Sequence, residues 1–214
     1  MPRRRKPPPA TVALLVRHGR TDTTGSVLPG RAPGLHLGEA GRAQAEAVAE
    51  RLAGLKRVDA VYASPLERTR ETAAAIAKRL GLRVRFDKGL LECDFGDWTG
   101  VELKALRKLP EWETVQRYPS GFRFPKGESF AEMQARVTAA VNRYQDRHPG
   151  GTVVVVSHAD PIKAVVADAA GTHLDLFQRL VISPCSVTAI AFSAAGPTVL
   201  MVNSVGDLAE LRAS

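Results

Sequence analysis

Residues 11–18 read TVALLVRH, a short apolar run that ends on a cation and an imidazole and is followed at once by a glycine. A run of this kind is typical of a buried strand. In α/β sheets, polar groups at the carboxyl end of such a strand lie in the crevice where ligands bind. Residues 152–157 form a second apolar run, which leads directly to His158. We therefore predict two buried strands that place Arg17, His18 and His158 near one another.

Strand-like and helix-like segments alternate along the rest of the chain. Further strands are predicted at 58–63, 83–86, 187–192 and 199–202, the last two as an edge hairpin. Helices are predicted at about 40–52, 64–80, 129–150 and 160–170. This alternation predicts the fold class α/β, as a three-layer α/β/α sandwich with a mainly parallel central sheet.

Three of these helices have clear start signals. The stretch SPLE at 64–67 has the pattern of a capping box with proline at the first helical position, and Ser129 with Glu132 has the capping-box pattern too. Asp160 precedes a proline and has the pattern of an N-cap. These signals predict that the helices begin close to the carboxyl ends of the preceding strands.

The stretch 90–126 shows no regular period and holds several large aromatic residues. We predict that it builds a small cap over the C-terminal edge of the strands, with the inserted part at about 100–129. The basic, proline-rich stretch 1–10 is predicted to be a disordered tail. The remainder, 11–214, has no repeat and no domain boundary, which predicts a single catalytic domain.

The composition is that of a globular protein, and its charge argues against a nucleic-acid partner. The chain has 214 residues, of which 44% are hydrophobic and 24% charged, an ordinary globular balance. Half of the formal net charge of +8 comes from four basic residues in the tail. The excess that remains suits a small phosphorylated substrate better than a nucleic-acid groove, so we expect no nucleic-acid partner.

The sequence also gives no sign of a membrane span or of a disulfide or zinc scaffold. No segment approaches the roughly 18 apolar residues that span a bilayer, so no membrane partner is expected. Cys93 and Cys185 are too few for a disulfide scaffold and lack the spacing of a zinc site. We therefore expect a cytoplasmic protein, and a homodimer is left open.

Cationic groups gather where the strands end and the next helices begin. Arg68 lies in the opening turn of the helix at 64–80, where the helix dipole disfavours a cation unless an anion is near. Arg17, His18 and His158 would join it and would repel one another with nothing between them. The ligand that such a cluster fits is a dianion such as phosphate, which guanidinium groups bind through paired hydrogen bonds.

Four motifs occur in a fixed order: LVRHGxT at 15–21, SPLxRTxxTA at 64–73, LExxFGxWxG at 91–100 and VSH at 156–158. In this order and spacing the chain resembles the histidine phosphatase superfamily, which includes the cofactor-dependent phosphoglycerate mutases. The resemblance extends from residue 12 to about residue 205. It implies that the predicted domain at 11–214 is a histidine-phosphatase-like catalytic domain.

The resemblance also implies a role for each residue of the cluster. His18 would be the nucleophile that takes the phosphoryl group and becomes a phosphohistidine. Arg17, Arg68 and His158 would bind the phosphoryl oxygens, so that neither a metal nor another cofactor is expected. Glu92 would protonate the leaving oxygen and then activate the attacking water.

The outer pocket is less well defined. The hydroxyl of Thr21 and the amide of Ala159 are further predicted donors, and Thr24 stands where the family usually has an asparagine that contacts the phosphoryl group. Arg31, in the glycine-rich loop after the first strand, is predicted to reach a second anionic group of the substrate, and Arg123 in the cap is a weaker candidate of the same kind, as is Lys126. Departures from the family pattern, such as Asp160, leave the substrate open.

We favour a phosphatase acting on a small phosphorylated metabolite. A mutase must keep its intermediate away from water, whereas the cap here is short and is expected to end in a flexible stretch at 119–121. The alternatives are a cofactor-dependent phosphoglycerate mutase or other phosphomutase, and an inactive relative that binds a phosphorylated ligand. His36, His148 and His173 lack a motif and are expected to be solvated or structural.

Overall fold

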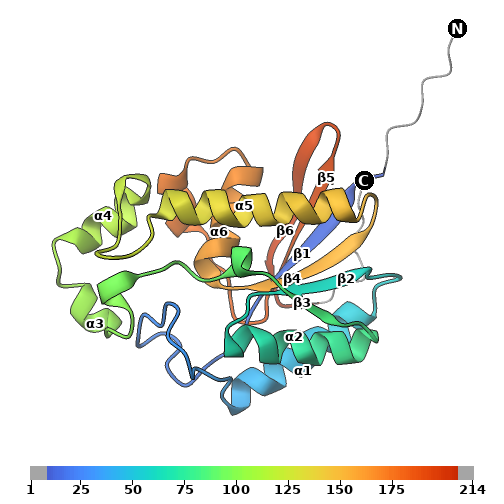
Figure 1. The fold of residues 1–214 in the computed structure, drawn as a ribbon, viewed down its shortest axis with the longest axis horizontal. Helices are drawn as coiled ribbons and strands as arrows, with labels where there is room; N and C mark the ends of the chain where they lie inside the picture. The colour runs from blue at the N-terminus through green and yellow to red at the C-terminus, as the bar shows by residue number, and fades with distance from the viewer. Residues whose placement is uncertain (1–8, 207–214) are drawn as a thin grey trace, which may run out of the picture.

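The structure is a computed structural model, and it describes residues 9–206 (Figure 1). Its centre is a six-stranded sheet in the order β3-β2-β4-β1-β5-β6. The first four strands in chain order pair in parallel, and β5 and β6 are antiparallel. The strands are β1 (Thr11–Arg17), β2 (Ala60–Ala63), β3 (Val84–Phe86), β4 (Thr152–Ser157), β5 (Val187–Ser193) and β6 (Gly196–Ser204). The predicted, mainly parallel sheet with its edge hairpin is confirmed.

Helices cover both faces of the sheet, which confirms the three-layer α/β/α architecture (Figure 1). Two of them, α1 (Glu39–Ala53) and α2 (Glu67–Leu80), lie together on one face, and α5 (Phe130–Arg147) and α6 (Ala159–Ala169) lie on the other. Because successive side chains of a strand point to opposite faces, Leu14 packs in one core and Leu15 in the other, and both are fully buried.

The strand register determines where the site lies. Arg17 is paired with Ser157 in the parallel ladder between β1 and β4, and the His18 amide continues it by donating to the Ser157 carbonyl at 3.0 Å. Each strand is followed by a histidine, so His18 and His158 leave the same edge of the sheet side by side.

The stretch before α5 is more regular than the sequence predicted. It contains the short helices α3 (Leu103–Leu106) and α4 (Glu111–Arg117) and the 3-10 turns η1 (Lys88–Leu90), η2 (Gly96–Trp98) and η3 (Pro119–Gly121); a further 3-10 helix, η4 (Leu174–Arg179), follows α6. Trp98 and Phe124 are buried in an aromatic cluster beneath these elements. The expectation of a flexible end at 119–121 is wrong, because η3 is a hydrogen-bonded turn and the Ser120 amide donates to Asp175 at 2.9 Å.

Two predicted helix starts are also wrong. The N-cap of α2 is Leu66, so the predicted capping box at Ser64 does not form, and the N-cap of α6 is His158 rather than Asp160. The capping box of α5, between Ser129 and Glu132, is confirmed. The predicted tail at 1–10 lies almost entirely outside the described residues. Within residues 9–206, no helix is both long enough and apolar enough to cross a bilayer.

Two glycines allow the loop after β1 to pass against α1. A Cβ on Gly41 would lie 1.9 Å from the Arg20 carbonyl oxygen, and one on Gly19 would lie 2.4 Å from the Gly41 carbonyl oxygen. Both distances are far below any real carbon–oxygen contact, so the two backbones touch. The helix therefore supports the loop that begins at His18.

We expect Gly41→Ala to destabilise the protein, because the added methyl group overlaps backbone that cannot move without shifting this loop. Overpacking of this kind costs about 1–3 kcal/mol, and each kcal/mol lowers the Tm of a chain of this size by about 2–4 °C. Gly54→Ala is the matched control, since Gly54 at the end of α1 has φ −70° and its Cβ would meet nothing closer than 3.4 Å. Equal Tm values for the two variants in a thermal melt would contradict the close approach.

Candidate active site

The two histidines that follow the strands share one buried site. The ring centroids of His18 and His158 are 5.2 Å apart in an edge-to-face arrangement, and both side chains are buried. Arg68 reaches them from the first turn of α2, with its Nε 3.3 Å from His18 Nε2, and its side chain is fully buried. The structure thus brings together groups that are 140 residues apart in sequence.

The ring of His18 is held in one tautomer. Its Nδ1 lies 2.7 Å from the Gly19 carbonyl oxygen, so Nδ1 carries the hydrogen and donates it, and Nε2 keeps its lone pair. Burial, and then the charges of Arg68 and Arg17, hold the pKa of His18 well below its ordinary value. His18 is therefore a neutral imidazole near pH 7, with an unprotonated Nε2 that accepts Arg68 Nε at 3.3 Å and has the electron pair that a nucleophile requires.

His158 has the same tautomer as His18, but the protein holds it through the other ring nitrogen. Its Nε2 lies 2.9 Å from Ser64 Oγ, and within the described residues this hydroxyl forms no other hydrogen bond. The hydroxyl must place its hydrogen on an acceptor, so Ser64 donates to Nε2 and the ring proton sits on Nδ1. Burial and the nearby charge of Arg68 also lower the pKa of His158, so the ring is a neutral donor.

Three buried donors of the site have no hydrogen-bond partner among residues 9–206: Arg17 Nε, Arg68 Nη1 and His158 Nδ1. The arginines are each anchored through another nitrogen, because Arg17 Nη1 donates to the Ile182 carbonyl at 2.6 Å and Arg68 Nη2 donates to the Gly30 carbonyl at 2.8 Å. Buried donors without a partner are costly and uncommon in folded proteins. Three of them in the cluster of His18 are an arrangement that could bind an oxyanion.

Glu92 supplies the acidic group of this cluster. Its side chain is buried, and its Oε1 accepts the Cys93 amide at 3.0 Å. Burial and the negative charge of Asp160 raise its pKa to about 7, against the opposing effect of Arg68 and Arg17. A carboxyl group with this pKa holds a proton at neutral pH and can also release it, which suits a general acid and base.

Three further predicted binding residues, Thr21, Thr24 and Ala159, lie on the segments that follow the two histidines. Thr21 is buried in the loop after His18, and its Oγ1 lies 2.9 Å from Thr24 Oγ1, which also accepts the Thr21 amide. Ala159 is the first residue of α6, so its amide lies at a helix N-terminus directly after His158.

Arg31 is bound within the protein beside the segment of Glu92. Its Nε donates to the Glu92 carbonyl at 2.8 Å, and its other nitrogens form ion pairs with Asp94 at 3.3 Å and Glu128 at 3.0 Å. That it also reaches a second anionic group of the substrate stays a prediction. The two cap cations are likewise ion-paired at the surface, Arg123 with Glu132 and Lys126 with Asp97.

Sequence reasoning missed several residues that support the site. Ser64 was interpreted as a helix cap, although the structure places its hydroxyl on His158. Thr72 accepts the Gly19 amide at 3.1 Å, and the pair of Glu128 and Arg136 binds the segment of Glu92. Asp160 was interpreted as a cap but acts on the pKa of Glu92. The sequence signals for these contacts are weak, because each joins distant parts of the chain.

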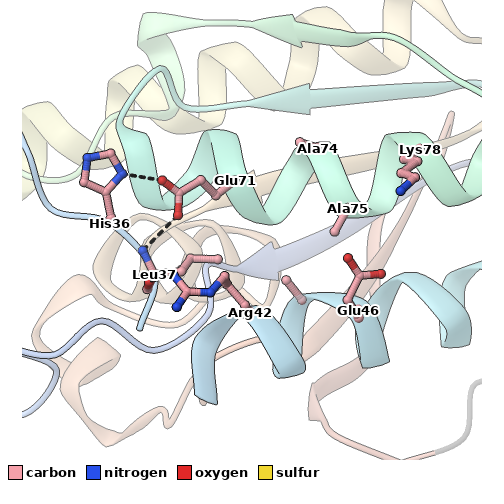
Figure 2. A pocket seen from close by; sticks show the side chains of 9 residues that line it. His36, Leu37, Arg42, Glu46, Glu71, Ala74, Ala75 and Lys78 are labelled. Carbon is pink, nitrogen blue, oxygen red and sulfur yellow. Dashed lines mark hydrogen bonds and ion pairs between the residues drawn. The ribbon is translucent and has the colours of Figure 1, made fainter. Parts of the chain in front are cut away.

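The remaining histidines lie apart from the cluster. His36 pairs with Glu71 beside a hollow of about 530 Å³ between α1 and α2, which contains none of the clustered residues (Figure 2). His148 Nε2 lies 3.0 Å from the Tyr62 hydroxyl, and His173 forms an ion pair with Asp175. In residues 9–206 no group of three or more His, Cys, Asp or Glu side chains is arranged to hold a metal ion.

Comparison with known proteins points to one family. The model described as histidine phosphatase superfamily (branch 1) matches residues 13–205. The chain is 31% identical over 210 residues to phosphoserine phosphatase 1 of Hydrogenobacter thermophilus, which covers 92% of this chain and 94% of that protein. The solved structure of mycobacterial glucosyl-3-phosphoglycerate phosphatase has a TM-score of 0.82 at 27% identity and covers 91% of this chain and 99% of that one.

A bifunctional protein of Mycobacterium tuberculosis is 36% identical over 202 residues, which is 92% of this chain. The match covers 55% of that protein, so this chain spans about half of its length. The similarity therefore concerns one part of that relative.

We expect Ser64→Ala to weaken the binding of inorganic phosphate about tenfold, the order of one hydrogen bond to a charged group. Without the hydroxyl, His158 no longer has a fixed tautomer, and its Nδ1 loses its hydrogen for part of the time. Isothermal titration calorimetry measures the effect. The control is Ser129→Ala, which removes a hydroxyl that caps α5 and should leave phosphate affinity unchanged; equal affinities in both variants would exclude the tautomer argument.

Proposed function

Because this chain belongs to the histidine phosphatase superfamily, we propose that it is a phosphatase that hydrolyses a small phosphomonoester through a phosphohistidine at His18. The observation that carries the proposal is the lone pair of His18 Nε2, which accepts only the long contact from Arg68 Nε, beside three buried N–H groups that have no partner among residues 9–206. Relatives that match most of their own length to this chain and are named phosphatases support it.

In the first step, His18 Nε2 attacks phosphorus and the ester oxygen leaves. Negative charge on the transferred group is balanced by N–H donors of Arg17, Arg68 and His158, which are already oriented and need no rearrangement. The departing alkoxide takes the proton of Glu92, whose pKa of about 7 keeps part of the population protonated at neutral pH. The products are an alcohol, a phosphohistidine and a Glu92 carboxylate.

In the second step, a water molecule attacks the phosphohistidine. The Glu92 carboxylate accepts a proton from the water, the phosphorus–nitrogen bond breaks, and His18 regains its lone pair on Nε2. Inorganic phosphate leaves, and Glu92 is again a carboxylic acid. The carbonyl of Gly19, which holds the Nδ1 hydrogen, stabilises the positive charge that the ring carries while phosphorylated.

A phosphomutase is the second candidate, and one feature of the cap favours it. The stretch 119–121 is anchored to η4 rather than flexible, so the cap is better suited to exclude water than its sequence indicates. Incubation with 3-phosphoglycerate and its bisphosphorylated form separates the two candidates. A mutase yields 2-phosphoglycerate, whereas the proposed phosphatase yields inorganic phosphate.

We expect His18→Ala to abolish the release of nitrophenol from p-nitrophenyl phosphate and the formation of an acid-labile phosphoprotein in rapid-quench experiments. The reason is that His18 Nε2 is the atom that takes the phosphoryl group in the proposed mechanism, whereas the lone pair of His158 Nε2 is engaged by Ser64 at 2.9 Å. The control is His36→Ala, which removes an exposed imidazole paired with Glu71. Unchanged turnover in the His18 variant would refute the proposed mechanism, and an inert wild type that still binds phosphate would identify the protein as a phospho-ligand-binding relative.

The role of Glu92 predicts a pH dependence. With an alkyl phosphate, kcat/KM should fall above about pH 7, because Glu92 is then ionised and cannot protonate the leaving oxygen. No loss from His18 is expected between pH 7 and pH 6, since its lowered pKa keeps the ring neutral there. The measurement is the ratio of kcat/KM of the wild type to kcat/KM of Glu92→Gln, taken below and above pH 7. The ionisation of the substrate affects both enzymes equally and cancels in this ratio.

That ratio should lie near 10²–10⁴ at low pH, the usual contribution of a general acid, and should decline through about pH 7. Glu39→Gln, at an exposed carboxylate at the start of α1, should have the wild-type profile. A ratio that does not change with pH would show that Glu92 is not the acid.

A further inference from the structure

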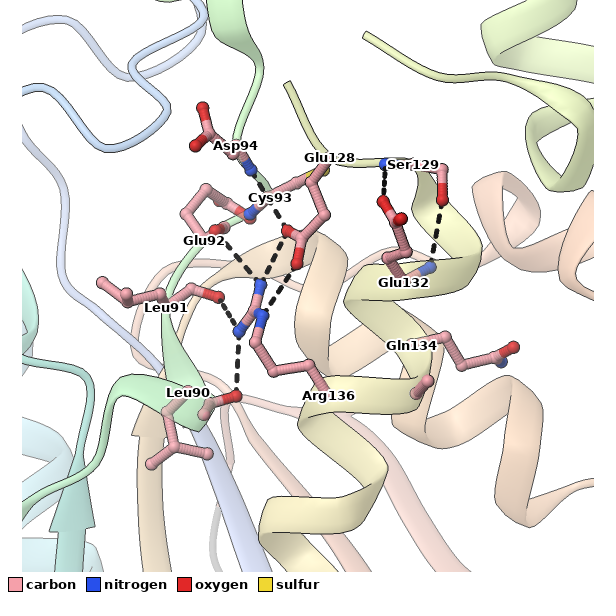
Figure 3. A network of polar contacts seen from close by, with 12 residues as sticks. Leu90, Leu91, Glu92, Cys93, Asp94, Glu128, Ser129, Glu132, Gln134 and Arg136 are labelled. Carbon is pink, nitrogen blue, oxygen red and sulfur yellow. Dashed lines mark hydrogen bonds and ion pairs between the residues drawn. The ribbon is translucent and has the colours of Figure 1, made fainter. Parts of the chain in front are cut away.

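Glu92 lies on a segment without regular secondary structure, yet its backbone is held by two arginines. Its carbonyl oxygen accepts Arg31 Nε at 2.8 Å and Arg136 Nη2 at 3.4 Å. Arg136 projects from α5 toward this segment (Figure 3), and Arg31 comes from the loop after β1. Its position is therefore determined by groups far away in the sequence.

Arg136 binds more than one residue of this segment. Its Nη1 donates to the Gly89 carbonyl at 2.9 Å and to the Leu91 carbonyl at 3.0 Å, in addition to the contact of Nη2 with Glu92. One planar guanidinium thus joins three carbonyl groups of the four residues that end at Glu92. Only a group with several donors in a rigid plane can do this.

Glu128 completes the arrangement just before α5. Its carboxylate accepts Arg136 Nε at 2.8 Å and Nη2 at 2.9 Å (Figure 3). The same carboxylate accepts Arg31 Nη2 at 3.0 Å. It also accepts the Asp94 amide at 3.3 Å, while its own amide donates to the Asp94 carbonyl at 2.8 Å. The side chain of Glu128 is 13% exposed, so these ion pairs are partly shielded from water.

We propose that Arg31, Glu128 and Arg136, here called the Glu92 clamp, are positioning residues that keep the Glu92 carboxyl within reach of the reacting oxygen in both steps. The inference rests on the proposed function. The two arginines of the clamp hold Glu92 through its carbonyl group, and their charges are paired with Glu128 and Asp94, so they contact the Glu92 backbone and not its carboxyl. Misplacement of a reacting group by 1 Å costs on the order of 10²-fold in rate.

The two steps of the reaction provide the test. Nitrophenolate is a weak base that leaves without a proton, so the first step with p-nitrophenyl phosphate does not need Glu92, whereas the attack of water on phosphohistidine does. Arg136→Lys keeps the charge but cannot join three carbonyls and a carboxylate. It should therefore release a first equivalent of nitrophenol as fast as wild type and then turn over about 10- to 100-fold more slowly.

With an alkyl phosphate, the leaving oxygen does need the proton of Glu92. The same variant should then release the first equivalent of alcohol more slowly than wild type as well. Arg31→Lys is a second variant for the case that Arg136→Lys does not fold. It should have the same pattern with a smaller loss, since Arg31 binds one carbonyl of residues 89–92, whereas Arg136 binds three. The matched control is Arg143→Lys on the same helix, whose guanidinium binds Asp87 at 2.9 Å and does not touch Glu92.

Equal slowing of the initial burst and of turnover in Arg136→Lys would indicate general structural damage and overturn the clamp. Behaviour like that of Arg143→Lys would overturn it too, and in both cases the proposed function stands because wild type remains active. A wild type that releases no nitrophenol and forms no phosphohistidine instead overturns the proposed function, and the role of the clamp with it.

Discussion

The burial of like charges at one edge of the sheet is the constraint on which the site depends. Arg68 is fully buried, Arg17 is partly so, and the imidazoles of His18 and His158 are buried with them. Burial, and then the charges of the arginines, lower the pKa of both histidines, so the rings are neutral and the guanidinium groups remain the positive charges of the cluster. Such an arrangement is stable only if each cation has good hydrogen-bond partners and the next partner to arrive is an anion.

The protein orients these cations through backbone carbonyls. Arg17 is anchored by the carbonyl of Ile182 and Arg68 by that of Gly30, and a carbonyl orients a guanidinium without cancelling its charge. Arg136 is different, because it binds carbonyls on one side and the Glu128 carboxylate on the other. Arg17 and Arg68 thus keep their positive charge for a phosphoryl group. The charge of Arg136 is balanced by Glu128, because this residue only positions the backbone.

Local sequence patterns predicted the parts of the site that lie at element ends. The strand of residues 11–17 ends at a cation, and the register of a parallel ladder then required His18 and His158 to be neighbours. The presence of Arg68 in the site was predicted from its place in the first turn of a helix. The partners of these residues could not be predicted in this way, because Ser64 has the sequence pattern of a cap and becomes a hydrogen-bond donor only through a contact 94 residues away.

Arg31 is the converse case, since an arginine in a glycine-rich loop has the pattern of a substrate ligand, while its ion pairs join three separate segments. Tertiary contacts also decide how the two histidines differ. Both follow an apolar strand, and both are buried and neutral. The Gly19 carbonyl takes the Nδ1 hydrogen of His18, which leaves a lone pair on Nε2, whereas Ser64 donates to Nε2 of His158, which leaves a hydrogen on Nδ1. One hydrogen bond on each ring therefore leaves the first imidazole with an unprotonated Nε2, as the proposed nucleophile requires, and the second with an unpartnered N–H donor within the described residues, although the chain reaches both by the same local pattern.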